Sequence, residues 1–214
     1  LTIAHASIQM LTCSDKWLLQ QVNRVLSLDG LGIREQLQLR RCREDIQWKL
    51  GLLDESLRGA RESLALALTL NDVVLEAIHR YRLANNMLSK QSHADNVAMA
   101  LQALTCVRGV GNPTLESQIL LVLSFLHSMA PEAGMVYLKQ AQAISEEIDS
   151  IYIQIRILRT QANFFSQMGE LDRAGACLHR LDFLLLVTPP NYHNSVTPFF
   201  NLDKTSADYH LQIW

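Results

Sequence analysis

The sequence predicts an all-α protein, built as a solenoid of antiparallel helical hairpins. Its 214 residues include only 9 Gly and 5 Pro. Between these, apolar residues recur three and four positions apart, which is the period of a helix. The periodic segments are about 15 to 20 residues long and are joined by short turns, as in antiparallel helix pairs. A hydrophobic fraction of 49% with 19% charged residues suffices for a buried core and excludes a disordered chain.

The helices can be placed in chain order from their start and stop signals. Ser14 caps the first clear helix, and a Gly-containing turn ends it at about residue 28. Pro113 and Pro131 each fit the first turn of a helix, where a backbone N–H is not needed. Two consecutive prolines, at 189 and 190, end the last clear helix. The predicted hairpins cover about residues 1–28, 33–70, 72–107, 113–148 and 150–187, followed by a loop or linker at 188–205 and a further helix or tail at 206–214.

The second helix of each predicted hairpin contains a recurring pattern. A small or branched residue is followed by Leu four positions on and by an apolar residue seven positions on. The first members of the pattern stand 37, 37 and 40 residues apart, which indicates degenerate repeats of one hairpin each. These first members are Ala60, Val97, Gly134 and Ala174.

One segment links these repeats to a known family. The run Gln-Met-Gly-Glu-Leu-Asp-Arg-Ala at 167–174, with Ala162 twelve residues before Ala174, resembles the turn and second-helix opening of a tetratricopeptide repeat (TPR). The resemblance covers about residues 33–187, although Asn85 stands where a small residue is expected. It implies a right-handed superhelical array. Similar long, degenerate repeats occur in large eukaryotic assembly proteins, including cell-cycle and chromosome-segregation factors.

The sequence contains no recognisable catalytic or metal-binding constellation. The seven His residues have no metal-ligand spacing, and no nucleophile has an evident base partner. The Gly-Val-Gly segment at 109–111 follows a helix, where the backbone presents carbonyl groups rather than the N–H groups that bind phosphate. We therefore expect no enzyme activity, no metal and no cofactor.

Charge and cysteine usage limit the partners and the compartment. A formal net charge of −2 gives no bulk attraction to nucleic acid, even though Arg34, Arg40, Arg41 and Arg43 form a local basic run. No apolar run approaches the length needed to span a membrane. The four cysteines are far apart within helical patterns, which favours free thiols in a reducing compartment. The expectation is an intracellular protein, cytoplasmic or nuclear, with no nucleic-acid or membrane partner.

Two rows of polar residues are the candidate binding residues. Each row follows the spacing i, i+3, i+7 and i+11, which places its members on one side of a helix. The TPR resemblance implies that these first helices face an inner groove, with Arg and Asn where the family grips a carboxylate. A solvated helix surface would show the same spacing, but the recurrence of two rows favours binding. The rows are His79, Arg82, Asn86 and Lys90, and Arg156, Arg159, Asn163 and Gln167.

The first helix between these two rows is apolar at the matching places. Ile119, Leu120, Leu123 and Leu126 interrupt the polar surface. They indicate either a hydrophobic pocket within the groove or a helix that is buried on both faces.

The function that these features predict is a scaffold or adaptor. It would bind an extended, acidic segment of a partner protein and be one subunit of a larger intracellular assembly. One alternative is a non-catalytic helical arm of a large enzyme or of a cell-cycle or chromosome-segregation complex. Another is a helical sensor that binds a peptide or small molecule, with the apolar helix at 119–126 lining the pocket. The first residue is Leu rather than Met, so we expect a piece of a longer protein.

Overall fold

The computed structural model describes residues 14–86 and 93–187, and these residues form nine α-helices and no strand. The prediction of an all-α solenoid is therefore confirmed. The helices are α2 (Asp15–Leu26), α3 (Ile33–Lys49), α4 (Leu53–Thr69), α5 (Val73–Asn86), α6 (His93–Val110), α7 (Pro113–Leu126), α8 (Pro131–Glu147), α9 (Ile151–Gln167) and α10 (Leu171–Val187).

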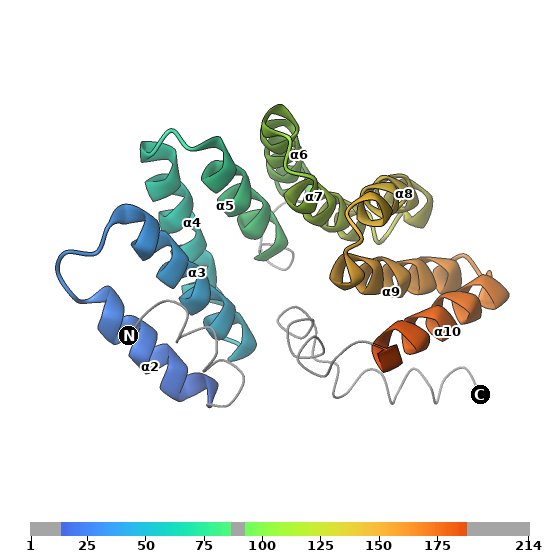
Figure 1. Cartoon of the computed structure of the whole chain (residues 1–214), viewed down its shortest axis with the longest axis horizontal. Helices are drawn as coiled ribbons and strands as arrows, with labels where there is room; N and C mark the ends of the chain where they lie inside the picture. The colour runs from blue at the N-terminus through green and yellow to red at the C-terminus, as the bar shows by residue number, and fades with distance from the viewer. Residues whose placement is uncertain (1–13, 87–92, 188–214) are drawn as a thin grey trace.

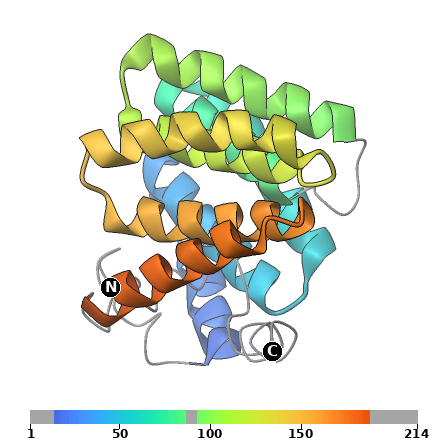
Figure 2. The same cartoon turned by 90° about the vertical axis from the view of Figure 1, so that its right-hand side faces the viewer.

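The helices pack as successive hairpins along an arc. Helices α3 and α4, α5 and α6, α7 and α8, and α9 and α10 form the pairs, and the second helix of each pair also packs on the first helix of the next. The first helices α5, α7 and α9 contact one another in turn and follow the inner side of the arc (Figure 1). Seen from the end of the array, α10 crosses the face turned toward the viewer (Figure 2).

The repeat length follows from the helix starts. The first helices begin at Ile33, Val73, Pro113 and Ile151, which are 40, 40 and 38 residues apart. In each hairpin, the twelfth residue of the first helix and the fourth residue of the second are both buried at the crossing of the two helices. These crossing pairs are Glu44 with Ser56, Ala84 with Asn96, Ser124 with Gly134, and Ala162 with Ala174.

The predicted repeat pattern matches this register in only two hairpins. Gly134 and Ala174 occupy the crossing position as expected, but Ala60 lies four residues beyond Ser56, and Val97 lies one residue beyond Asn96. The sequence pattern was misplaced in the first two hairpins because polar residues occupy their crossings, where a small apolar residue was sought.

The helix ends follow the predicted start and stop signals. Asn112 accepts a hydrogen bond from the backbone N–H of Leu115 at 3.0 Å, and Pro113 fills the first helical position. Ser14 caps α2 by accepting from the backbone N–H of Trp17 at 3.3 Å. Gly111 and Gly169 end α6 and α9 at φ values of 65° and 78°, a left-handed conformation that glycine adopts without strain.

Helix α7 lies at the centre of the main hydrophobic core. That core is built from residues of α5 to α10, and α7 contributes Ile119, Leu120, Leu123 and Leu126, all of them buried. A helix that is apolar all round belongs inside a protein. Of the two interpretations of this apolar segment, burial on both faces is therefore correct.

Three predicted segments lie outside the described residues. They are the first part of the 1–28 hairpin, up to residue 13, and the two C-terminal segments predicted at 188–205 and 206–214. Within the part of the chain that the structure describes, no helix is long and apolar enough to cross a membrane.

Candidate functional site

The polar row on α9 lies on the side of that helix that its neighbours leave open. Asn163 and Gln167 are exposed, and Arg156 and Arg159 are half-buried. The opposite side of α9 is buried against α7, α8 and α10. The apolar residues on that opposite side are Ile153, Ile157, Leu158, Phe164 and Phe165.

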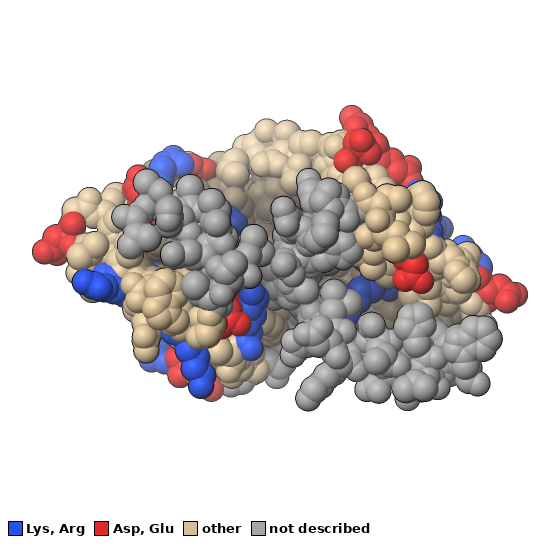
Figure 3. Space-filling view, turned by 60° about the horizontal axis from the view of Figure 1, so that its bottom comes forward, with Lys and Arg blue, Asp and Glu red and all other residues tan. Residues whose placement is uncertain are grey.

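Local contacts arrange the α9 row. The guanidinium of Arg156 lies 5.8 Å from the centre of the Tyr152 ring, one turn earlier. The side-chain amide of Gln167 donates to Oδ1 of Asn163 at 3.0 Å. Helix α9 contains two Arg and no Asp or Glu, so its open face is basic. In the view from the open side of the arc, Lys and Arg side chains are visible on both arms of the molecule (Figure 3).

The row predicted on α5 has a different environment. His79 is only 1% exposed and Arg82 only 5% exposed. Only the backbone of Asn86 is described, at the end of α5, and Lys90 lies outside the described residues. The structure therefore places the α9 row on a surface and the described side chains of the α5 row in the interior. Whether the α5 row contacts a partner stays a prediction.

Arg82 is held between α5 and α3. Its Nη2 donates to Asp45 Oδ1 at 2.5 Å and to the backbone carbonyl of Arg41 at 3.3 Å. Its Nε lies 3.8 Å from Oε2 of Glu44, which is fully buried. Arg82 thus joins two consecutive hairpins through carboxylates of the first, a structural role that the sequence did not indicate.

The two rows are also out of register, because they start one residue apart in their helices. Ala84 and Ala162 are both the twelfth residue of their helix, so they define equivalent positions. Arg82 is the tenth residue of α5, whereas Arg159 is the ninth residue of α9. One residue rotates a side chain by about 100° around the helix axis. The recurrence in register that favoured binding is therefore wrong. The offset alone does not account for the burial of Arg82, because Tyr81, the ninth residue of α5, is buried as well.

The corrected register adds one exposed residue, Arg41, that the sequence analysis did not include in the binding rows. The ninth residue of each first helix is Arg41, Tyr81, Leu121 or Arg159. Tyr81 and Leu121 are buried, while Arg41 is exposed on α3. The ninth position is therefore an at least partly exposed arginine on α3 and α9 and a buried residue on α5 and α7. Alignment of the first helices by the 40-residue spacing of their starts would have identified these equivalent positions from the sequence.

Glu44 occupies the crossing position that is small in the other hairpins. Helix α4 accommodates it with Gly59, where an added Cβ would lie 3.3 Å from Glu44 Cγ. Ser63 donates to Glu44 Oε1 at 2.6 Å, and Ser56 donates to the backbone carbonyl of Glu44 at 3.0 Å. Its Oε2 has no hydrogen-bond partner among the described residues. The α3–α4 hairpin thus has a polar contact with one hydrogen-bonded carboxylate oxygen where the α9–α10 hairpin has two alanines.

Burial changes the titration of this cluster. Loss of solvent raises the pKa of Glu44, although the charge of Arg82 and the hydrogen bond from Ser63 oppose the change. Burial, reinforced by the charges of Arg82 and Arg41, lowers the pKa of His79 to about 4, so this imidazole is neutral at pH 7. Burial would lower the pKa of Arg82, but the carboxylate of Asp45 and other neighbours raise it. The cluster is therefore built around one permanent cation.

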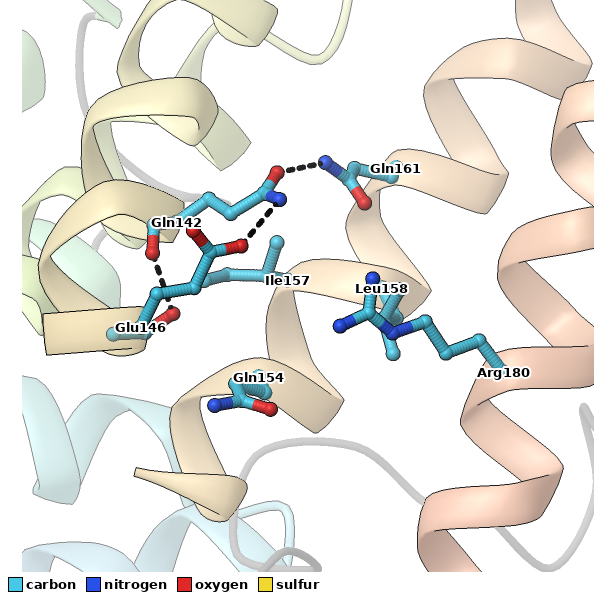
Figure 4. Close-up of a pocket in the computed structure, with 8 residues that line it drawn as sticks. Gln142, Glu146, Gln154, Ile157, Leu158, Gln161 and Arg180 are labelled. Carbon is cyan, nitrogen blue, oxygen red and sulfur yellow. Dashed lines mark hydrogen bonds between the residues drawn. The ribbon is translucent and has the colours of Figure 1, made fainter. Parts of the chain in front are cut away.

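A polar recess lies on the other side of α9 from its binding row. It is shallow, opens to solvent, and is lined by residues of α8, α9 and α10 (Figure 4). Gln161 donates to Gln142 at 2.8 Å, and Gln142 donates to Glu146 at 2.9 Å. Arg180 extends from α10 along the opposite wall (Figure 4). These amides mainly satisfy one another and so join α8 to α9.

No grouping of three or more His, Cys, Asp or Glu side chains suited to a metal ion occurs in residues 14–86 and 93–187. In the recess, the Ser145 hydroxyl donates to the backbone carbonyl of Gln142 at 2.8 Å rather than to a base. The described side chains can form charge-assisted hydrogen bonds and bury apolar surface, which is the chemistry of binding.

Comparison with known proteins places the fold. No protein-family model and no curated protein matches the sequence. Two solved structures match over most of the chain: a Podosopora anserina protein assigned as a kinesin light chain with nearly identical TPR-like repeats, and a single-substitution variant of it. The variant is 10% identical in sequence and has a TM-score of 0.64, and the match covers 85% of this chain and 92% of that chain. The other is 10% identical, with a TM-score of 0.63 and 86% and 92% covered. In its fold, the chain is an α-solenoid of TPR-like repeats.

Proposed function

We propose that this chain is a protein-interaction scaffold that binds an extended, acidic segment of a partner on the open face of α9. The supporting observation is that Arg156, Arg159, Asn163 and Gln167 share the one face of α9 that no described helix covers. A curved array of hairpins offers a larger surface than a globular domain of equal mass. The proposed mechanism is binding alone, without catalysis.

The chemistry of the row supports an acidic segment. A guanidinium can bind a carboxylate through two parallel hydrogen bonds, and an Asn or Gln amide can pair with the donors and acceptors of an extended backbone. Because α9 has two Arg and no acidic residue, a basic segment would be repelled there. A C-terminal carboxylate or an Asp or Glu side chain would serve equally as the anion.

The described side chains of the α5 row do not form part of the proposed binding surface. His79 and Arg82 are buried, so substitution of either would change the fold before it changed a surface. The proposal therefore rests on α9, with Arg41 on α3 as a second basic position on the same side of the array. The larger assembly and a cytoplasmic or nuclear location remain parts of the proposal.

The test uses short fluorescent peptides with acidic, neutral or basic sequences, each with a free or an amidated C-terminus. Fluorescence anisotropy should show binding of the acidic set to the full chain. The double substitution Arg156→Glu with Arg159→Glu should weaken it by about 10- to 100-fold, because a hydrogen bond to a charged group contributes about 1.5 to 3 kcal/mol. Circular dichroism should show unchanged helicity.

The matched control is Arg61→Glu, the same charge reversal at an exposed position of the second helix α4. It should leave peptide affinity unchanged. An equal loss of peptide affinity in the control and in the double variant would mean that binding depends only on net charge. Unchanged affinity in the double variant would show that the binding surface is not on α9.

The sensor alternative loses its structural basis. It required the apolar residues of α7 to line a pocket, but Ile119, Leu120 and Leu123 are completely buried in the core. The alternative of a helical arm in a larger enzyme or complex is compatible with the same binding face, because such an arm would also hold a partner segment.

A further inference from the structure

The last helix, α10, has large apolar residues on its solvent side. Phe183 is 62% exposed and Leu186 is 85% exposed, and Leu171 and Val187 are also more than half exposed. Patches of this kind on a folded protein mark interaction sites more often than scattered single residues do.

The fold of the hairpin does not require these residues. The positions equivalent to Phe183 in α4, α6 and α8 are Ala65, Thr105 and Ala143, and all three are exposed. The positions equivalent to Leu186 are Leu68, Arg108 and Glu146, which are exposed as well. In the other hairpins these positions are therefore never covered by the next hairpin, and they are mostly small or polar. Continuation of the array does not explain Phe183 and Leu186.

The exposed stripe on α10 has small side chains in its first half and large side chains in its second half. Residues three and four apart share a helix face, so Gly175, Ala176 and His179 lie in line with Phe183 and Leu186. An added Cβ at Gly175 would meet nothing within 4 Å, which means that the helix surface is open there. One half thus presents a depression and the other half presents protruding side chains.

We propose that this stripe binds a second copy of the chain, with the two α10 helices antiparallel. Around a two-fold axis at His179, Phe183 of each copy meets Gly175 and Ala176 of the other, and Leu186 and Val187 meet the first turn at Asp172 and Leu171. A two-fold interface pairs the same patch with itself, and only an antiparallel pairing matches the large half to the small half.

The charges along the stripe agree with this arrangement. Asp182 lies one turn from His179 on the same face, so in the antiparallel pair each Asp182 lies near the His179 of the other copy. At the axis itself, the two His179 imidazoles face each other. A partner helix of different sequence would need a matching large and small pattern, whereas the second copy supplies it. This pairing is independent of the proposed role of the α9 row.

Sedimentation velocity of the full 214-residue chain over a concentration series tests the proposal. We expect a monomer–dimer equilibrium. Phe183→Glu and Leu186→Glu should each weaken association by about tenfold or more, because truncation or reversal of a central aromatic or aliphatic anchor has effects of this size. The matched control Leu68→Glu, at the position of α4 equivalent to Leu186 and 43% exposed, should leave the dimer intact.

Gly175→Leu distinguishes a second copy from any other occupant. The substitution fits the monomer, since the space beside Gly175 is empty, but it fills the depression that receives Phe183. Association should fall about as far as with Phe183→Glu. A dimer that survives Gly175→Leu would overturn the antiparallel pairing, and a chain that is monomeric at every concentration would overturn the proposal and leave a different protein or the chain itself as the occupant.

A cross-link locates the axis. In the native cysteine background, His179→Cys should give a disulfide-linked dimer under mild oxidation, because the two substituted residues face each other. Lys139→Cys, at the equivalent exposed position of α8, should not. Equal cross-linking of the two variants would place the contact elsewhere.

Discussion

The α3–α4 hairpin and the α9–α10 hairpin have the same geometry at their crossing but different chemistry. In the last hairpin, Ala162 and Ala174 let the two helices approach through small apolar side chains. In the α3–α4 hairpin, a buried glutamate takes the equivalent place, accepts a hydrogen bond from Ser63 at one oxygen and is balanced by the charge of Arg82 of the next hairpin. The comparison teaches that the architecture tolerates a buried charge at its closest approach, provided that a neighbouring hairpin supplies the compensating cation.

The largest expected effect comes from breaking that compensation. Arg82→Leu should lower the free energy of unfolding by about 3 to 5 kcal/mol, because removing one member of a buried ion pair leaves a buried carboxylate without its partner. Chemical denaturation monitored by circular dichroism measures the change. Arg159→Leu, on α9, should lower the free energy of unfolding less, because Arg159 is half-buried whereas Arg82 is buried. Equal effects of the two variants would contradict the difference between the rows.

The pH dependence sharpens the same comparison. The pKa of His79 is lowered from 6.5 to about 4 in the folded protein, so between these pH values the unfolded chain binds a proton that the folded chain does not. Stability contributed by neutral His79 is therefore present above pH 6.5 and is lost as the pH falls toward 4, by up to about 3 kcal/mol. Glu44, whose pKa is raised, opposes this loss, because its protonation in the folded state stabilises the protein as the pH falls.

Denaturation midpoints at several pH values between 7 and 4 check this prediction. His79→Gln should flatten the decline, while the exposed His93→Gln on α6 should retain it. A decline that is as steep in the His79 variant as in the wild type would assign the acid sensitivity to other groups.

The next effect compares two glycines in second helices. At Gly134, an added Cβ would lie 2.7 Å from the Phe164 ring and 2.9 Å from the backbone oxygen of Ser124. Because neither can move freely, Gly134→Ala should cost about 1 to 3 kcal/mol through overpacking. At Gly59, the nearest atom is Glu44 Cγ at 3.3 Å, so a small shift of one side chain accommodates Gly59→Ala. Thermal unfolding of the two variants should show a clear loss for the first and a much smaller one for the second.

The smallest expected effect is a gain. Gly175→Ala on α10 meets no neighbouring atom, so it should raise stability by about 0.5 to 1 kcal/mol through the higher helix propensity of alanine. Measured by denaturation at a low protein concentration, a loss of stability would show that the backbone at Gly175 is constrained in a manner that its open surroundings do not reveal.

The architecture was within reach of the sequence, since helical periodicity and scarce Gly and Pro report on local structure directly. The repeat register was harder to obtain. Alignment on small residues failed in the first two hairpins, because Glu44 and Asn96 occupy positions that are small in the last two. The sequence alignment matched Asn85, rather than Ala84, to Ala162 of α9. This error of one residue made the α5 row look equivalent to the α9 row.

Burial of a charge is the second thing that the sequence could not supply. Arg and Glu are almost never fully buried unless they are paired, and the pair here joins residues 44 and 82, which lie in different hairpins. The residues of the α9 row were identified correctly as polar and co-facial because both properties depend only on the spacing within one helix.

The ion pair between Arg82 and the carboxylates of α3 also bears on how the array can be rebuilt. Modular engineering of solenoids assumes that units can be shuffled, duplicated or exchanged, since each contacts only its neighbours through similar surfaces. Here the unit that contains Glu44 can be followed only by one that supplies a guanidinium at the tenth position of its first helix, and the first helices that open at 113 and 151 have Val122 and Thr160 there. A chimera that brings the first unit next to either of them would leave its acid uncompensated.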